Sequence, residues 1–336
     1  MADDHARATL RPAPPGFRLR RPGWDDLDRV AALYAATSRA RGASAPVRPD
    51  DLRFRWLGLD SFDEALLIEH EGTEPGPVAY AAFEAFVDPW TGELDLHAEG
   101  TVHPEWRSHG LAGFLLARAE DRARLAARDA GRPGALLRTS LEDGDDRARA
   151  WFASHGFTPV RHLLELHLDL HAPPPAAVWR SGVRCRPFRP GEDEQVLWET
   201  HQAAFADVPT HLPLDLEDFL DDRLRRYPEL DPGLVLLAEH DDEVVGLAIC
   251  RAGTEVAPED GWVRDLGVVP GWRRHGIGMA LLRTAFAAFR ARGLTGVALE
   301  VDDVTLDGAV ALYRRAGMRT VRRTDVLERW LELEAP

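Results

Sequence analysis

The chain has 336 residues, which is long for one domain and favours two domains of about 150 residues each. Hydrophobic residues make up 45% of it, enough for buried cores, and the net charge of −15 argues against a nucleic-acid surface, because phosphate binding needs a basic face. The absence of Lys excludes lysine Schiff-base chemistry and a lysine-bearing P-loop; Asn is absent too. The two cysteines, Cys185 and Cys250, are predicted to be buried free thiols, and no Cys/His spacing indicates a metal site.

The first residues lack the basic end and apolar core of a signal peptide, and no uninterrupted apolar run approaches membrane-spanning length. We therefore expect a soluble cytoplasmic protein with neither a membrane nor a nucleic-acid partner, either a monomer or a homodimer. Residues 1–16 are polar and contain three prolines, which predicts a disordered N-terminal tail.

From Phe17 onward the chain repeats itself. The segment that begins at Phe17 can be laid over the segment that begins at Val183, a shift of 166 residues, and the same shift places residues 107–112 (RSHGLA) on residues 273–278 (RRHGIG). A near-constant shift over this length indicates duplication, and a third match, of the segment from Ala148 with the segment from Ala309, needs a shift of 161. The repeat predicts an N-terminal domain over 17–171, a stiff Pro-rich linker over 172–182 and a C-terminal domain over 183–336.

Each copy is predicted to contain a strand, a helical region, two strands, a strand–turn–helix unit, a further strand, a short helix and a terminal strand pair. The order predicts an α+β fold, repeated twice, in which a mixed and mostly antiparallel sheet is flanked by helices. The expected strands are Phe17–Arg20, Ala65–Glu69, Val78–Phe86 and Ala135–Thr139 in the first copy, and Val183–Arg186, Leu234–Glu239, Val244–Arg251, Trp262–Val269 and Gly296–Val301 in the second.

The strand–turn–helix unit of the second copy runs from Gly261 to Gly293. Apolar residues recur at helical spacing from Ile277, which predicts a helix with one wide buried face, and Gly293 provides the stop. Gly276 and Gly278 at the helix start leave its first N–H groups free of covering side chains, so the turn is predicted to bind an anion, above all a phosphate. Arg273 and Arg274 add positive charge beside it.

This Arg-x-x-Gly-x-Gly turn after a Val-rich strand resembles the pyrophosphate-binding turn of the GNAT superfamily of N-acetyltransferases, and the element order is similar to the GNAT fold over nearly all of Phe17 to Leu333. The tandem layout is similar to that of two-domain actinobacterial members. The resemblance implies acetyl-CoA as cosubstrate and no metal. It also implies that the strand before the turn binds the pantetheine arm, with Gly267 marking a bulge. The cofactor-binding residues implied are Leu266, Gly267, Val268, Arg273, Arg274, His275, Gly276, Ile277, Gly278, Met279 and, in place of the family's frequent Asn, Thr305.

The segment from Gly308 to Met318 resembles the family's last helix, whose Leu-Tyr pair places a phenol near the cofactor sulfur. The resemblance implies that Tyr313 protonates the departing thiolate as a general acid. The aligned position of the first copy is Phe152, which has no proton to give. We therefore expect catalysis in the second copy and a catalytically degenerate first copy.

The general base stays open at this point. Asp265 and Glu300 are the preferred candidates, and Glu259, Asp260 and Asp302 are alternatives at strand ends. The acceptor is expected against the helical region 200–227, which includes the acidic residues Asp218, Asp221 and Asp222.

We predict an acetyl-CoA-dependent N-acetyltransferase that acts on the primary amine of a small molecule by direct attack. Two alternatives remain: acetylation of a cysteinyl sugar, and an acyl-CoA-binding or sensor protein without turnover.

Overall fold

The computed structural model of the chain forms two compact units. Unit 1 comprises residues 1–160 together with 324–336, and unit 2 comprises residues 161–323. The structure describes residues 11–41, 52, 56, 64–72, 76–88, 91–208, 211, 213–225, 230–253, 259–303 and 308–333.

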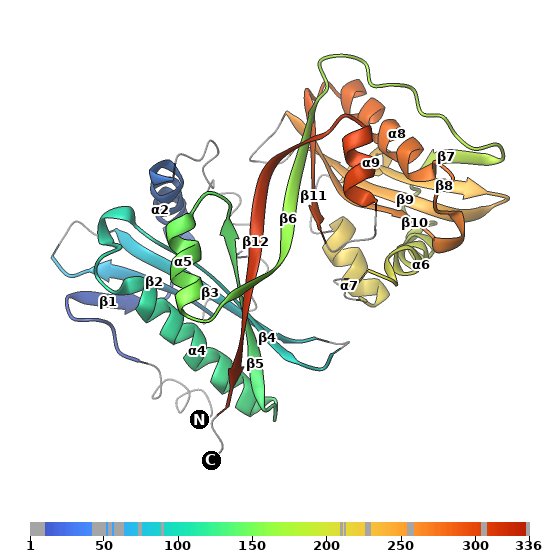
Figure 1. The fold of residues 1–336 in the computed structure, drawn as a ribbon. Coiled ribbons are helices and arrows are strands. Elements are labelled where there is room, and N and C mark those ends of the chain that lie inside the picture. Colours follow the sequence, from blue (N-terminus) through green and yellow to red (C-terminus); the bar gives the residue numbers. More distant parts are fainter. Residues whose placement is uncertain are drawn as a thin grey trace. The chain divides into compact units, whose positions relative to one another are not determined.

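Unit 1 contains a sheet with the strand order β1-β2-β3-β4-β5-β12 (Figure 1). Its neighbouring strands are antiparallel except β4 and β5, which are parallel. Its elements are β1 (Phe17–Arg20), the 3₁₀ turn η1 (Trp24–Asp26), α2 (Leu27–Ala40), β2 (Ala65–His70), β3 (Pro77–Val87), β4 (Leu94–Val102), η3 (Pro104–Trp106), α4 (Leu111–Asp129), β5 (Gly134–Glu142), α5 (Asp146–Ser154) and β12 (Arg319–Glu332).

Unit 2 repeats this architecture with the strand order β7-β8-β9-β10-β11-β6. The β10–β11 pair is parallel and the other pairs are antiparallel. Its elements are β6 (Thr158–Asp169), β7 (Val183–Pro187), α6 (Glu194–Phe205), α7 (Leu216–Leu220), the π-helical turn η4 (Asp221–Arg225), η5 (Pro232–Leu234), β8 (Val235–His240), β9 (Glu243–Ala252), β10 (Asp260–Val268), η6 (Pro270–Trp272), α8 (Ile277–Ala291), β11 (Gly296–Asp302) and α9 (Ala309–Arg315).

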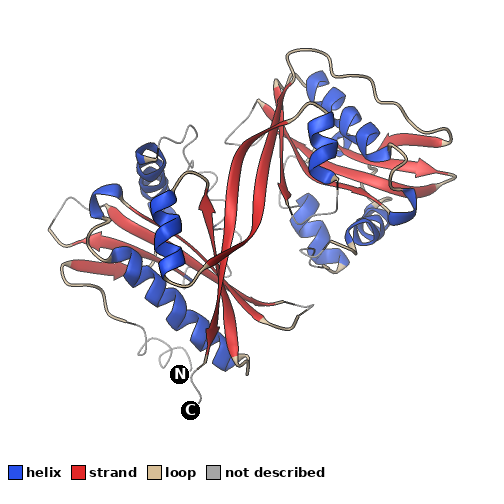
Figure 2. Cartoon of the chain, viewed as in Figure 1, coloured by secondary structure: helices blue, strands red, loops and turns tan. Residues whose placement is uncertain are grey.

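The predicted fold class is confirmed. Helices lie on both faces of the strands in each unit (Figure 2). In unit 2, the stripe from Ile277 through Leu281 and Ala285 to Phe289 buries α8 against one face of the sheet, as its spacing predicts. The opposite face packs against α6 and α7 through Leu197 and Phe219.

The compact units depart from the boundaries predicted from the repeat, 17–171 and 183–336. The strand that ends the first copy, β6, pairs with β11 in unit 2 over residues 163–169. The strand that ends the chain, β12, pairs with β5 in unit 1 over residues 324–332. Each copy therefore contributes its last strand to the sheet of the other, an exchange that neither strand's own sequence reveals. The residues of the predicted N-terminal tail that the structure describes begin at Arg11, which pairs with Asp121 of α4 at 3.1 Å.

Cys250 is buried on β9, as predicted, whereas Cys185 on β7 is only half-buried. Both are free thiols, and burial raises the pKa of Cys185 to about 11.

A buried carboxylate cluster ties the start of each copy together. In unit 2, Asp193 before α6 accepts hydrogen bonds from Arg186 at 2.5 Å and Arg189 at 3.0 Å, and Arg186 also pairs with Glu239 of β8. Burial alone raises the pKa of Asp193, but the hydrogen bonds from Arg189 and Arg186 outweigh it and hold the pKa well below its ordinary value. Unit 1 repeats the arrangement with Arg20, Asp26 and Glu69.

We predict that Asp193→Asn lowers the free energy of unfolding at pH 7 by about 2 kcal/mol, because two guanidinium groups lose a charged, buried acceptor. Because the folded-state pKa of Asp193 is depressed, its contribution is present above the unfolded value of about 4 and is lost as the pH falls through the folded value. Urea unfolding followed by circular dichroism at pH 7 and below pH 4 measures both effects. The exposed neighbour Glu192, changed to Gln, is the control. An equal loss in both variants would contradict the assignment.

Candidate active site

A cavity of about 980 Å³ in unit 2 brings together most of the residues predicted for the site. It is bordered by β10, β11, the start of α8, α9, α6 and the turn η4. The predicted residues among its lining are Asp265, Leu266, Gly267, Val268, Arg273, Arg274, Gly276, Ile277, Gly278, Met279, Glu300 and Tyr313. His275 is exposed beside Trp272 and does not line the cavity, and Thr305 lies outside the described residues.

The cavity exists because β10 and β11 separate. Their parallel pairing covers only Asp260–Trp262 against Gly296–Ala298, although β10 continues to Val268 and β11 to Asp302. Beyond Trp262, none of the described strands pairs with the edge of β10 that faces β11.

The peptide groups of Leu266 and Val268 face this open edge. The N–H of Val269 bonds to Val245 of β9, so by the alternation of an antiparallel pair Gly267 also faces β9, whereas its two neighbours face away. The Val268 carbonyl accepts a hydrogen bond from Arg273 Nε at 3.0 Å. The N–H groups of this edge point where the resemblance places the pantetheine arm.

Gly267 does not mark the bulge that the sequence suggested. The register of β9 and β10 shifts between Val263 and Asp265, and Gly267 pairs regularly with Leu247. Glycine is needed at this position for packing: a Cβ there would lie 2.9 Å from Ala204 Cβ and 2.9 Å from the Phe205 ring. The absence of a Cβ at Gly267 lets α6 approach β10 closely.

The glycine turn has the geometry that the sequence predicted for an anion site. Gly276 caps α8 with a φ of 83°, a left-handed conformation that favours glycine, and no atom lies within 4 Å of the place its Cβ would take. The first helical hydrogen bond runs from Ala280 N–H to the Gly276 carbonyl at 3.0 Å. The N–H groups of the first three helical residues, Ile277 to Met279, therefore have no acceptor within the helix.

The two arginines of the turn differ in what they contact. Arg273 donates to the Ala204 carbonyl at 2.9 Å and pairs with Asp207 at 2.5 Å, so it joins the turn, β10 and α6. Arg274 is exposed and has a positive φ of 65°, and the structure shows no ion pair between it and any other described residue. Within the described residues, Arg274 is thus the arginine of the turn whose charge no carboxylate neutralises.

Tyr313 projects from α9 into the same cavity and is 9% exposed. Burial raises the pKa of its phenol above the ordinary value, and the negative charge of Asp265 raises it further. The phenol is therefore protonated throughout the neutral pH range, as a proton donor must be.

Asp265 lies between an imidazole ring and two guanidinium groups. Its carboxylate lies 3.4 Å from His201 Nε2 and 3.1 Å from Arg223 Nε. Burial alone raises the pKa of Asp265, but the His201 ring and the charges of Arg223 and Arg264 outweigh it and lower the pKa below its ordinary value. Sequence reasoning missed His201, which lies in the segment expected to bind the acceptor.

The other carboxylates divide into two groups. Glu300 lies on β11, exposed at the cavity, and Asp302 lines the cavity while paired with Arg161. Glu259 and Asp260 lie at the paired end of β10, where Asp260 contacts His167 at 3.0 Å, and neither lines the cavity.

The segment 200–227 contributes to the wall, but not through its acidic residues. Asp218, Asp221 and Asp222 are not part of the lining, and Asp222 instead accepts hydrogen bonds from Arg264. The lining residues from this segment are His201, Ala204, Phe205, Val208, His211 and Arg223.

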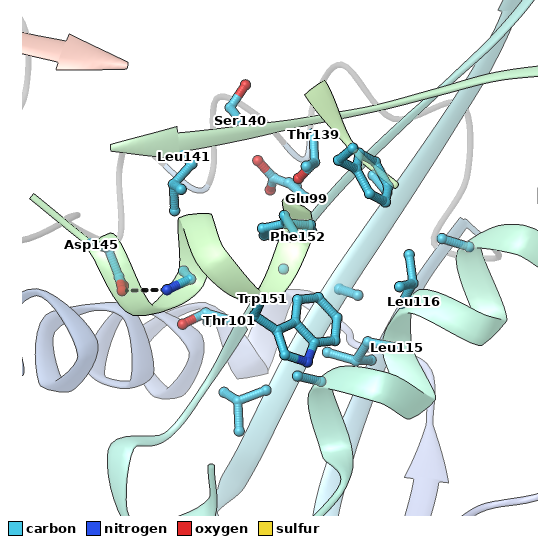
Figure 3. Close-up of a pocket in the computed structure, with 18 of the residues that line it drawn as sticks. Glu99, Thr101, Leu115, Leu116, Thr139, Ser140, Leu141, Asp145, Trp151 and Phe152 are labelled. Atoms are coloured by element: carbon cyan, nitrogen blue, oxygen red, sulfur yellow. Dashed lines mark hydrogen bonds between the residues drawn. The ribbon is translucent and has the colours of Figure 1, made fainter. Parts of the chain in front are cut away.

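Unit 1 has a smaller pocket of about 330 Å³ at the matching place. β4 and β5 also separate after pairing over Asp95–His97, so the backbone framework is the same. Figure 3 shows the Trp151 ring of α5 beside Leu115 of α4, and Phe152 of the same helix also lines the pocket. Aromatic rings of α5 therefore border this space, where unit 2 presents the Tyr313 phenol.

Comparisons with known proteins agree with this geometry. Residues 195–318 match the model of the acetyltransferase (GNAT) family. The mycothiol acetyltransferase of Thermobispora bispora is 34% identical over 296 residues, which are 87% of this chain and 92% of that protein. The chain belongs to the GNAT family of acetyltransferases. It is accordingly an enzyme of the acyltransferase class.

Solved GNAT structures extend the match to both units. A GCN5-related N-acetyltransferase from Sphaerobacter thermophilus aligns with a TM-score of 0.80 and 30% identity, covering 97% of this chain and 98% of that one. A tandem GNAT protein from the clavulanic acid biosynthesis pathway aligns with a TM-score of 0.68 at 16% identity, covering 95% and 100%. The second likeness concerns the fold alone.

Within the described residues, no helix combines the length and apolar character needed to cross a membrane. The same part of the chain contains no group of His, Cys, Asp and Glu side chains arranged to hold a metal ion.

We predict that Gly276→Asp weakens acetyl-CoA binding by about 30-fold, about 2 kcal/mol, because it places a negative side chain beside the free amides of α8. Isothermal titration calorimetry measures the dissociation constant. Gly110→Asp is the matched control, because Gly110 caps α4 at a similar φ of 76° with equally open space. The two changes impose the same backbone strain. Loss of binding from the Gly110 change alone would contradict the assignment to unit 2.

Proposed function

We propose that unit 2 transfers the acetyl group of acetyl-CoA to the primary amine of a small molecule by direct attack. One observation supports this above the others: a single cavity holds the free amides at the start of α8, the unpaired edge of β10 and the buried phenol of Tyr313. The amides of α8 are an anion-binding site, the edge of β10 supplies amide donors and the phenol is an acid. Acyl transfer from a thioester requires these three kinds of group.

Each part has a role that follows from its position. The N–H groups of Ile277, Gly278 and Met279, with Arg274 nearby, hold the diphosphate. The edge at Leu266 and Val268 binds the pantetheine arm and orients the thioester, whose carbonyl is polarised by an amide donor of that edge.

The remaining steps are proton transfers. The acceptor must lose a proton to become a neutral amine, and a group of the cavity wall must receive it; Asp265 and Glu300 are the carboxylates predicted for this from the sequence. Tyr313 gives its proton to the departing thiolate. The nitrogen that has formed the new amide bond returns a proton to the Tyr313 oxygen, so that the phenol is restored.

We predict that Tyr313→Phe lowers kcat by about 100-fold and changes the dissociation constant of acetyl-CoA by less than about twofold. The ring stays in place and only the proton donor is removed. Stopped-time acetylation assays with product quantified by mass spectrometry measure kcat, and calorimetry measures binding. Phe152→Leu, at the matching place of unit 1, should leave kcat unchanged. An unaltered kcat in Tyr313→Phe would contradict the acid assignment.

For the acceptor, we propose a cysteinyl sugar. The relatives that match this chain across both units include proteins named mycothiol acetyltransferase, at 34% and 35% identity over 87% and 94% of the chain. The net charge of −15 is compatible with an acceptor that arrives as an ammonium ion.

We predict that a cysteinyl amide of glucosamine is acetylated with a kcat/KM at least about 100-fold above those of cysteine amide, glucosamine and a panel of alkyl amines. Loss of the sugar contacts would remove binding energy that positions the amine. Parallel assays with purified protein at fixed acetyl-CoA give the ratios. A higher value for a simple amine would favour the broader small-amine function. No turnover with any compound despite tight acetyl-CoA binding would favour a sensor.

We propose that unit 1 is catalytically degenerate. The matching pocket is about a third the volume of the cavity in unit 2 and carries Phe152 where the acid would be needed. A structural role for the first copy agrees with its contribution of β6 to the sheet of unit 2.

A further inference from the structure

His201 is a buried and unsatisfied polar side chain in the wall of the cavity. It is 2% exposed, and neither of its ring nitrogens makes a hydrogen bond to a described residue. A buried imidazole in this state costs free energy unless a bound molecule or water makes a hydrogen bond to it. Nothing in the packing of α6 requires a polar group here, since the ring stacks on Phe205 at 4.5 Å and lies 4.9 Å from Phe219.

The position of Asp265 determines which ring nitrogen of His201 carries the proton. Oδ1 of Asp265 lies 3.4 Å from Nε2 of His201, while Oδ2 lies 3.1 Å from Nε of Arg223. A carboxylate beside Nε2 favours the tautomer with its proton on that nitrogen, which leaves Nδ1 with a lone pair. The pair therefore has the arrangement of an imidazole base that a carboxylate orients.

A bulge in β10 brings Asp265 to His201. Val263 packs in the core under α8, and Leu266 packs against the same core, so two residues between them point to the opposite face. Those two residues are Arg264, which bonds to Asp222 of η4, and Asp265. In a regular strand, residues 263 and 265 would point to the same side, and the bulge at Arg264 turns Asp265 to the other side.

Unit 1 lacks both features. The register of β3 with β4 is regular from Ala79–Val102 to Val87–Leu94. The buried positions Val30 and Thr37 of α2 match Leu197 and Ala204 of α6 at a shift of 167, one more than the shift of the first strands, and at this shift Tyr34 matches His201. The unit that carries the phenol is therefore the one with the bulge and the histidine.

We propose that His201 is the base that accepts the proton of the acceptor's ammonium group, with Asp265 as its positioning residue; this rests on the proposed function and adds its missing step. The N–H bond of the ammonium breaks, its electron pair remains on nitrogen as the nucleophile, and the proton forms a bond to Nδ1 of His201. After the acetyl group has moved, the imidazolium releases this proton to solvent. The proton that Tyr313 gives to the thiolate is a different one, and Tyr313 recovers it from the nitrogen of the new amide.

The charged groups around His201 are consistent with this role. Asp265 compensates the imidazolium once it forms, and Arg223 compensates Asp265. The His211 ring lies 5.4 Å away and hydrogen-bonds to Gln202, and burial lowers the pKa of His211, which keeps that neighbour neutral. The titratable and charged groups that share this cavity with His201 are Asp265 and Arg264 of β10, Arg223 of η4, His211, Arg273 and Arg274 of the glycine turn, Glu300 and Asp302 of β11, and Tyr313 and Arg315 of α9.

The test is the pH dependence of kcat/KM for His201→Gln, with the cysteinyl amide of glucosamine and acetyl-CoA as substrates. We expect a loss of about 100-fold at pH 6.5, where the acceptor's α-amine, with a pKa of about 8, is protonated. The loss should shrink below about fivefold at pH 9, where solution supplies the neutral amine. Acetyl-CoA affinity by calorimetry should stay within about threefold, which shows that the fold is intact.

Two further variants separate this role from others. Tyr34→Phe, the matched position of unit 1, should keep kcat/KM within about twofold at every pH. Glu300→Gln tests the competing carboxylate and should show no loss that depends on pH. A loss of equal size at pH 6.5 and pH 9 in His201→Gln, or a pH-dependent loss in Glu300→Gln instead, would overturn the assignment.

A wild-type protein without turnover would overturn the proposed function and this inference with it. Turnover with a pH-independent ratio overturns only the role of His201.

Discussion

The site depends on one interruption in the sheet of unit 2. β10 and β11 run parallel for three paired residues, from Asp260 to Trp262, and then separate. Backbone N–H and C=O groups need partners, and a strand edge inside a domain that has none offers them to a ligand. Every other part of the site is arranged around this open edge: the turn at its end, the α9 phenol beyond it and the α6 histidine behind it.

The duplication separates framework from chemistry. Both units show the separation of the two parallel strands and the left-handed glycine that opens the following helix. They differ in a few side chains and in one extra residue of β10. Phe152 replaces a phenol, Tyr34 replaces an imidazole, and the bulge that turns Asp265 toward α6 has no counterpart in β4. Similar backbones thus carry two different pockets, because packing preserves the sheet while a handful of positions set the reactivity.

Ion pairs of unit 2 also join α6 to neighbouring elements. Asp193 and its arginines hold the first strand, the second strand and α6 together, far from any reacting atom. Arg273 and the exposed carboxylate of Asp207 form a second pair, which joins the glycine turn to the end of α6. Arg273 also bonds to the Val268 and Ala204 carbonyls, so it holds the C-terminal end of α6 against β10, and His201 lies on this helix.

The sequence by itself determined the duplication, the order of the elements and the turn at Gly276, because these depend on local spacing and on residue types that tolerate few conformations. It also singled out Tyr313 through a resemblance carried by a short helix. Only the tertiary structure decided the exchange of β6 and β12 between the sheets, the place of the bulge, the packing reason for Gly267 and the meeting of His201 with Asp265. These depend on contacts between residues far apart in the chain, for which neither partner's own sequence carries a pattern.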